Sequence, residues 1–233
     1  MSRISTACLD MAGTTVADEG SVMAAFEAAM ARFGLRPGAR GYDQANRIVH
    51  ETMGQSKIEV FRRILDNEAD AQEANSAFEI AYAASVRAGS VAPIPGATET
   101  LVALRAARIK VCLATGFSPA TRNELVDALG WRPLIDLALS PSDAGRGRPW
   151  PDMPLTALLR LGGGAVAELA VVGDTPSDVE SGLRAGAGLV AGVLTGSASR
   201  EELEQAGAPH IIDSITDLLP LVGIGVGPTT VAS

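Results

Sequence analysis

Five short apolar runs, each ending in small or polar residues, recur along this chain and limit what it can fold into. The runs are ISTACLD, IKVCLATG, LIDLALS, ELAVVGD and GLVAGVL. Each is preceded or followed by a stretch with helical periodicity, and this alternation is typical of parallel sheets covered by helices on both faces. We therefore predict an α/β fold with a doubly wound, Rossmann-like parallel sheet.

A long helical segment interrupts this alternation after the first apolar run. Residues 18–93 show helical periodicity and contain no comparable strand. A segment of this length is too long for a loop and indicates an inserted helical cap domain. The α/β core is then discontinuous, over 1–17 and 94–219, and the glycine-rich end, 220–233, is expected to be a flexible tail.

The first helix of the insertion is predicted from apolar residues at helical spacing. These residues are Val22, Phe26, Met30 and Phe33. Ser21, directly before them, could cap the helix. The apolar face could either fill the core of the cap or pair two subunits in a homodimer.

Composition argues against several classes of partner. A net charge of −8 without a basic stripe argues against nucleic-acid binding. No apolar stretch has the length of a membrane span, and no signal peptide is evident, so we expect a cytoplasmic protein without membrane contact. Cys8 and Cys112 lie in apolar runs and are expected to be buried thiols. His50 and His210 have no partners at metal-ligand spacing, which argues against zinc.

Polar residues follow four of the predicted strands. Asp10 ends the first strand, Thr115 the second, and Arg148 and Asp174 follow the third and fourth. Ligands of open parallel sheets bind beyond the carboxyl ends of the strands. Two carboxylates, a hydroxyl and a guanidinium suit a magnesium ion and a phosphoryl group, and Gly13 lets the backbone approach them closely.

The motifs DMAGTT, LATG, GRPWP and GDTPSD, in this order and with the insertion after the first, resemble those of the haloacid dehalogenase superfamily over nearly the whole chain. The resemblance implies that Asp10 is a nucleophile that takes the phosphoryl group as an aspartyl phosphate. It implies Mg²⁺ ligands at Asp10, the carbonyl of Ala12, Asp174 and Asp178. It also implies phosphoryl ligands at Thr14, Thr115, Gly116 and Arg148.

Two of these assignments have alternatives. Asp178 lies three residues after Thr175 with Pro176 between them, which also fits a purely structural helix cap. Arg146 could replace Arg148 as the phosphate ligand. We favour Arg148 because it lies within GRPWP, the part of the sequence that matches the superfamily.

Ala12 points to one branch of the superfamily. Most of its phosphatases carry a second aspartate at this position, which protonates the departing oxygen. The absence of that acid, together with an arginine at position 148, resembles the phosphonatase branch, phosphonoacetaldehyde hydrolase and its close relatives. The resemblance implies a small-molecule phosphonate substrate and cleavage of a carbon–phosphorus bond.

Enzymes of that branch form an imine between a cap lysine and the substrate aldehyde, and MGQSKIEVF places Lys57 at the matching position. Ser56 and Glu59 predict a capping box that starts a helix at Lys57, where the helix dipole disfavours another positive charge. Burial under the cap, with Met53 nearby, would lower the lysine pKa further. The alternative is a solvated lysine at a helix start, paired with Glu59.

Two positions depart from the pattern of the phosphonatase branch. Val60 stands where that branch often has a histidine, and Phe117 stands where a tyrosine follows the second motif. Both of the missing groups would assist proton transfer during imine formation. A hydrolase of phosphonoacetaldehyde or a close analogue remains the leading hypothesis. The alternatives are a phosphatase acting on a small phosphate ester and a non-catalytic phosphate-binding module.

Overall fold

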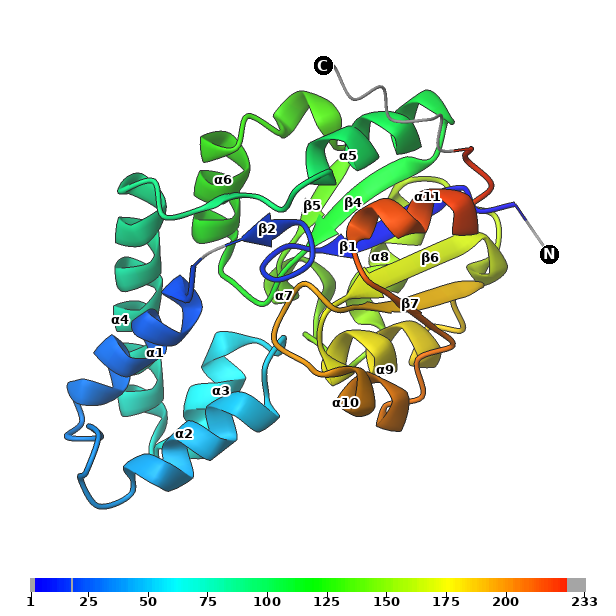
Figure 1. Cartoon of the computed structure of the whole chain (residues 1–233). Coiled ribbons are helices and arrows are strands. Elements are labelled where there is room, and N and C mark those ends of the chain that lie inside the picture. Colours follow the sequence, from blue (N-terminus) through cyan, green and yellow to red (C-terminus); the bar gives the residue numbers. More distant parts are fainter. Residues whose placement is uncertain (1–2, 18, 226–233) are drawn as a thin grey trace.

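The computed structural model describes residues 3–17 and 19–225 of the chain. Six parallel strands form its main sheet, in the order β5-β4-β1-β6-β7-β8 (Figure 1). The strands are β1 (Thr6–Asp10), β4 (Lys110–Ala114), β5 (Leu137–Leu139), β6 (Leu169–Gly173), β7 (Leu189–Val193) and β8 (His210–Ile212). The five predicted runs form the first five of these strands, which confirms the α/β class, and the short edge strand β8 was not predicted.

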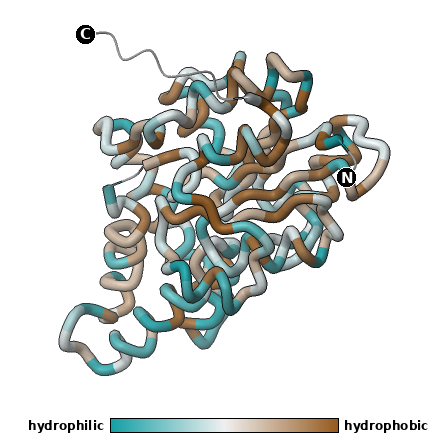
Figure 2. The backbone as a smooth tube through the Cα atoms, turned by 45° about the vertical axis from the view of Figure 1, so that its right-hand side comes forward, coloured by the Kyte–Doolittle hydropathy of each residue, from teal (hydrophilic) through white to brown (hydrophobic). Residues whose placement is uncertain are grey.

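Helices cover both faces of the sheet. One face carries α5 (Ala97–Ala106), α6 (Pro119–Ala128) and α11 (Leu218–Leu221), and the other carries α7 (Pro141–Ala144), α8 (Asp152–Arg160), α9 (Pro176–Arg184) and α10 (Arg200–Gln205). Short 3₁₀ turns complete the connections at η1 (Arg132–Leu134), η2 (Val166–Glu168) and η3 (Ile215–Asp217). Ala7 and Leu9 of β1 pack into the core shared with α5, whereas Cys8 packs into the core shared with α8. The strands therefore bury both faces and appear hydrophobic along their length (Figure 2).

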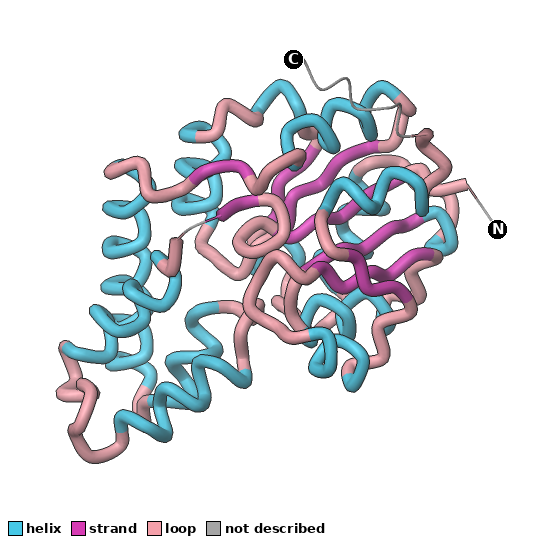
Figure 3. The backbone as a smooth tube through the Cα atoms, in the orientation of Figure 1, coloured by secondary structure: helices cyan, strands magenta, loops and turns pink. Residues whose placement is uncertain are grey.

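Four helices lie between β1 and β4 in the chain and stand beside the sheet rather than on either of its faces (Figure 3). They are α1 (Ser21–Ala31), α2 (Tyr42–Glu51), α3 (Lys57–Ile64) and α4 (Glu68–Arg87). A two-stranded antiparallel ribbon of β2 (Val16–Ala17) and β3 (Ala92–Pro93) connects them to the sheet. The predicted helical insertion is present, and we call α1 to α4 the cap.

An aromatic cluster joins the cap to the core. The Phe26 and Phe78 rings lie 4.7 Å apart between centroids, and Phe61 lies 5.4 Å from Phe26. The ring of Tyr82 lies 4.4 Å from that of Phe117, which belongs to the loop after β4. Because the cluster takes rings from both parts of the chain, the cap and the core share one hydrophobic cluster.

The start of the cap differs from the sequence prediction in one detail. Ser21 is the first residue of α1, and Gly20, in the left-handed region at a φ of 83°, is the N-cap. Ser21 therefore does not cap the helix. Val22, Phe26 and Met30 are buried within the chain's own core, so this face is filled internally. A homodimer through the cap helices stays a prediction that these three side chains do not support.

The flexible tail was predicted over 220–233, but the first residues of this range belong to the folded core. They finish α11, and Val222 and Ile224 pack against the hydrophobic core. Residues 226–233 lie outside the described part of the chain. Within the described part, no helix has both the length and the apolar character needed to span a membrane.

We expect Phe78→Ala to lower the free energy of unfolding by about 3–5 kcal/mol, because it removes a fully buried ring from the aromatic cluster. Ile80, two residues later on α4, is 65% exposed and provides a matched control. Ile80→Ala should change the free energy by no more than about 0.5 kcal/mol. Urea unfolding of the three proteins measures this, and equal effects of the two substitutions would contradict the proposed packing.

Candidate active site

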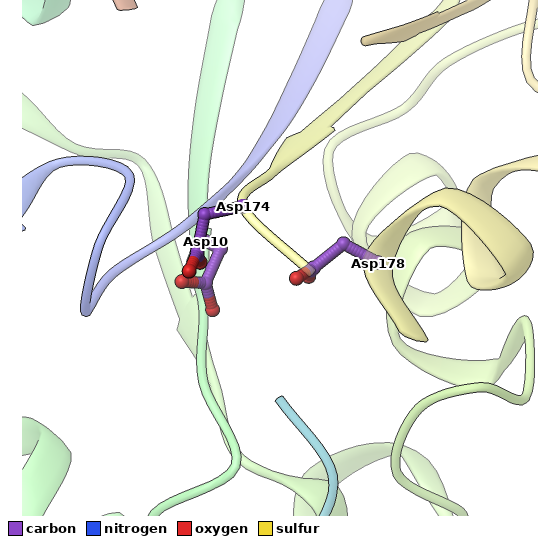
Figure 4. A group of neighbouring side chains, drawn as sticks. All are labelled: Asp10, Asp174 and Asp178. Carbon is purple, nitrogen blue, oxygen red and sulfur yellow. The ribbon is translucent and has the colours of Figure 1, made fainter. Parts of the chain in front are cut away.

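Three buried aspartates meet at the carboxyl edge of the sheet. Asp10 ends β1, Asp174 directly follows β6, and Asp178 lies in the first turn of α9. Figure 4 shows the three side chains directed toward one another, and one carboxylate oxygen from each lies within 4.8 Å of the others. Because β1 and β6 are neighbours, the topology brings together residues that are far apart in sequence. The structure thus brings together the three carboxylates predicted as metal ligands.

Asp174 is held by residues from two loops. Ser197, in the loop after β7, donates from its backbone N–H at 2.8 Å and from its hydroxyl at 3.1 Å to Asp174 Oδ2. The Thr14 hydroxyl donates to Asp174 Oδ1 at 3.4 Å, and the Thr14 N–H donates to Met11 O. Thr14 therefore contacts Asp174 and does not line the cavity described below, and its role as a phosphoryl ligand stays a prediction. Ser197 was missed, although its position just after the fifth predicted strand was a usable signal.

Two glycines make room for the Asp174 carboxyl group. A Cβ atom at Gly13 would lie 2.6 Å from Asp174 Oδ2, and one at Gly196 would lie 2.0 Å from the same atom. Gly13 also has a φ of +87°, which side-chain-bearing residues rarely adopt. Both positions require glycine for the carboxyl group to fit there.

Asp178 is a helix cap that also lies in the charged cluster, and its role as a metal ligand stays a prediction. Its Oδ2 accepts from the Thr175 N–H at 3.2 Å and from the Thr175 hydroxyl at 2.5 Å, so the two residues form a capping box at the start of α9. Its Oδ1 lies 2.6 Å from Nε of Arg148. One carboxyl group therefore fixes the helix start and also takes part in the charged cluster.

Arg148 is the cation of this cluster. Its Nη1 lies 2.8 Å from Asp10 Oδ1, and its Nη2 donates to the carbonyl oxygen of Ala114 at 3.0 Å. Arg146 lies at the surface, where it pairs with Asp152 and lies over the ring of Trp150. The choice of Arg148 over Arg146 therefore agrees with where the structure places them, although contact with a phosphoryl group stays a prediction.

The donor set suits a divalent cation. Burial raises the pKa of Asp10 well above its ordinary value, with the charges of Asp178 and Asp174 adding to the rise and Arg148 opposing it. Burial and the charge of Asp178 also raise the pKa of Asp174 to about 6. Clustered carboxylate oxygens with excess negative charge are the ligands that Mg²⁺ prefers. The residues present therefore fit a magnesium ion, and the carbonyl of Ala12 stays a predicted further ligand.

Lys57 is buried, with an exposure of 5%. It is the first residue of α3, as predicted, with Ser56 as N-cap, but the Ser56 side chain makes no capping hydrogen bond. The predicted capping box fails because the Glu59 side chain pairs with Arg62 instead, at 2.5 Å. The alternative of a solvated lysine paired with Glu59 is therefore wrong.

Aromatic rings surround the Lys57 amine. Its Nζ lies 5.4 Å, 5.8 Å and 5.3 Å from the ring centroids of Phe26, Phe78 and Phe117. Burial lowers the pKa of Lys57 from 10.5 to about 8, and the charge of Asp10 opposes the shift. About a tenth of the amine is therefore neutral at pH 7, far more than for an ordinary lysine, and the neutral form is the one that attacks a carbonyl carbon.

One cavity of about 350 Å³ is lined by Lys57 and by two of the three aspartates, Asp10 and Asp174. Its polar lining includes Asp10, Ala12, Lys57, Thr115, Gly116, Arg148, Asp174 and Ser197, and its apolar lining includes Val16, Val22, Met23, Met53 and Phe117. The Thr115 hydroxyl accepts from the Phe117 N–H at 3.3 Å. All the predicted site residues except Thr14 and Asp178 therefore line this cavity. Those two lie outside the lining but contact residues that belong to it, Thr14 through Asp174 and Asp178 through Arg148.

A parallel α/β sheet with a buried carboxylate cluster at its carboxyl edge, and with four helices inserted after the first strand, is the arrangement to compare with known hydrolases. The family model for haloacid dehalogenase-like hydrolases matches residues 4–186. The chain belongs to this family.

Relatives within the family carry a more specific name. A phosphonoacetaldehyde hydrolase of Parabacteroides distasonis is 30% identical over 94% of this chain and 95% of its own length. One of Bordetella pertussis is 33% identical over 56% of this chain and 55% of its own length. A crystal structure of a phosphonoacetaldehyde hydrolase-like protein from Oleispira antarctica superposes with a TM-score of 0.79 at 27% identity, covering 95% of this chain and 92% of the other.

We expect Mg²⁺ to raise the melting temperature of the protein and Asp174→Asn to abolish most of that rise. A ligand at a hundred times its Kd stabilises a folded protein by about 2.7 kcal/mol. Asp213, whose side chain is 85% exposed, supplies the control substitution Asp213→Asn, which should leave the rise unchanged. Thermal melts at increasing Mg²⁺ concentration measure the effect. An equal rise in all three proteins would place the ion elsewhere.

The reactivity of Lys57 should increase with pH through a midpoint near 8, since the neutral amine forms above its lowered pKa. Acetic anhydride labelling followed by peptide mass mapping measures the rate at each pH. The chain has only two lysines, and the exposed Lys110 serves as the internal reference. A Lys57 midpoint close to 10.5 would show that the amine is not desolvated.

Proposed function

We propose that this protein is a Mg²⁺-dependent phosphonatase that cleaves the carbon–phosphorus bond of phosphonoacetaldehyde or a close analogue, in the cytoplasm. The observation that carries the proposal is a buried amine, Lys57, in the same cavity as the carboxylate of Asp10. An ordinary phosphate ester needs no amine beside its leaving group. A carbon leaving group needs an electron sink, and an imine provides one.

The reaction begins at the amine. Neutral Lys57 Nζ attacks the aldehyde carbon, and uptake of one proton from solvent with loss of water leaves an imine that carries a proton on nitrogen. The pKa of Lys57, lowered to about 8, supports this step because the amine reaches its neutral form without a neighbouring base. That matters here, since Val60 and Phe117 provide no ionisable group beside the amine.

Phosphoryl transfer follows from the acidic cluster. Asp10 attacks phosphorus, and the carbon–phosphorus bond breaks as its electron pair moves through carbon to the imine nitrogen, giving an enamine. In the proposed reaction, Arg148, 2.8 Å from Asp10 Oδ1, orients the nucleophile and binds the phosphoryl oxygens. A bound Mg²⁺ would neutralise charge between the carboxylates and the phosphonate. Water then hydrolyses the aspartyl phosphate to phosphate, and the enamine takes up a proton and water to release acetaldehyde and Lys57.

The proposal also accounts for the alanine at position 12. An acid at this position would protonate a departing alkoxide, but an enamine leaves without taking up a proton at the same moment. Ala12 lines the cavity, and its small side chain leaves space where the acid of a phosphatase would stand. The shared name of relatives that are about 30% identical supports the same assignment.

Borohydride trapping tests the amine directly. In the presence of phosphonoacetaldehyde, we expect sodium borohydride to convert Lys57 to a stable secondary amine and to inactivate the enzyme. Peptide mapping is simple because Lys110 is the only other lysine and should remain unmodified. Without substrate, borohydride should leave both lysines unchanged.

Two substitutions separate the proposed reaction from a plain phosphatase. Lys57→Arg should lower phosphate release from phosphonoacetaldehyde by roughly 10³-fold or more, the scale of losing a catalytic group, whereas Lys110→Arg should have no effect. Asp10→Asn should abolish release from any substrate. Faster release from an aryl phosphate than from phosphonoacetaldehyde, with no adduct on Lys57, would overturn the proposal in favour of a phosphatase.

A further inference from the structure

Glu79, in the middle of α4, makes a short polar link between the cap and the core. Its Oε1 accepts from the backbone N–H of Ser118 at 3.0 Å, and its Oε2 accepts from the Ser118 hydroxyl at 2.7 Å. Oε2 also accepts from the hydroxyl of Thr121. Ser118 is the N-cap of α6, so a carboxylate from the cap binds the start of a core helix, where negative charge is stabilised.

The other hydrogen bonds between the cap and the core near the active site are longer. The Lys57 N–H donates to Gly116 O at 3.3 Å, Arg148 Nη1 donates to Gly54 O at 3.3 Å, and Gln55 Nε2 donates to Ser177 Oγ at 3.4 Å. All three are beyond the usual range for such bonds. The loop that carries Lys57 is therefore only weakly hydrogen-bonded to the core.

The segment anchored by Glu79 continues directly into the loop that meets Lys57. Ser118 follows Gly116 and Phe117, and the Phe117 ring lies over the Lys57 amine. At Gly116, a Cβ atom would lie only 2.3 Å from the carbonyl oxygen of Gln55. The two loops meet backbone to backbone, so a small shift of α6 relative to α4 would separate them.

We propose that Glu79 is a positioning residue, which holds α4 against the start of α6 and thereby keeps Lys57 in the cavity it shares with Asp10. Glu79 touches neither of these groups in the structure and acts through Ser118 and the loop before it. The proposal concerns the free protein and does not depend on which substrate is cleaved.

Glu79 could also influence Lys57 through its charge. The charged groups that act on the amine are Asp10, Glu79, Arg148 and Asp174, and Glu79 raises the Lys57 pKa. A charge effect moves the pH midpoint of Lys57 labelling. A positional effect changes the rate reached at high pH, where the amine is fully neutral, because that rate depends on how easily the reagent reaches the buried amine. The two effects can therefore be separated in one measurement.

The experiment compares Glu79→Ala with Glu79→Gln in the full chain, without substrate. Acetic anhydride labels Lys57 from pH 6 to 11, and Lys110 provides the internal reference. Glu79→Ala should raise the high-pH rate at Lys57 at least about tenfold, since it removes all three hydrogen bonds. Glu79→Gln can keep them, because the hydroxyls of Ser118 and Thr121 can also accept. It should lower the midpoint and leave the high-pH rate within about threefold of wild type.

Arg87 supplies the matched control, because it also links α4 to α6 but through an exposed ion pair with Glu124. Arg87→Ala should leave both the high-pH rate and the midpoint unchanged. Thermal melts report whether each variant is folded at the labelling temperature. If Glu79→Ala does not fold, a double variant with Ser118→Ala and Thr121→Val replaces it in the experiment. This variant removes the two hydroxyl groups of the core that donate to Glu79, and it should also raise the high-pH labelling rate at Lys57.

Two results would overturn the proposal. One is a high-pH rate in Glu79→Ala, or in the double variant, equal to that of wild type. The other is a rise in the high-pH labelling rate of Arg87→Ala as large as that of Glu79→Ala, which would show that any loosening between α4 and α6 exposes Lys57. Because labelling needs no substrate, either result leaves the phosphonatase assignment untouched, and failure of the borohydride test leaves the role of Glu79 untouched.

Discussion

Three carboxylates within 4.8 Å of one another, buried at the edge of the sheet, are the constraint on which the rest of the site depends. Burial and mutual repulsion both disfavour their charged forms, so the cluster needs a compensating cation. Arg148 meets part of that need by pairing with Asp10 and Asp178 at 2.8 Å and 2.6 Å. It cannot neutralise three negative charges alone, which is why the arrangement suits a divalent ion as well.

The same excess of negative charge bears on Lys57. Burial among three aromatic rings lowers its pKa, while Asp10 and Glu79 act in the opposite direction, and the balance lies at about 8. An isolated lysine buried to this extent would be neutral at much lower pH, and an exposed one would stay charged. The packing of the cap against the core thus sets both where the amine lies and how readily it gives up its proton.

The sequence was informative where backbone topology alone decides the outcome. Asp10 and Asp174 could be placed together because parallel strands end at one edge, whichever side chains surround them. Local side-chain pairing was less predictable, since Glu59 fits a capping box by spacing but pairs with Arg62, three residues later on the same helix. Glu79 carried no signal at all, because its partners belong to α6, and a contact between distant helices leaves no pattern in one sequence.

Phe117 shows how the departures from the branch's pattern are compatible with the proposed chemistry. A tyrosine hydroxyl at this position would help move protons, and phenylalanine loses that help. The phenylalanine ring instead packs against that of Tyr82, with centroids 4.4 Å apart, and lies 5.3 Å from Lys57 Nζ, so it completes the apolar surroundings that lower the lysine pKa. Desolvation can supply a neutral amine without an adjacent base, whereas a polar group in place of the phenylalanine ring would bring water to the amine. In the proposed reaction, an apolar enclosure that depends on cap closure therefore takes over part of the work of the missing proton-transfer groups.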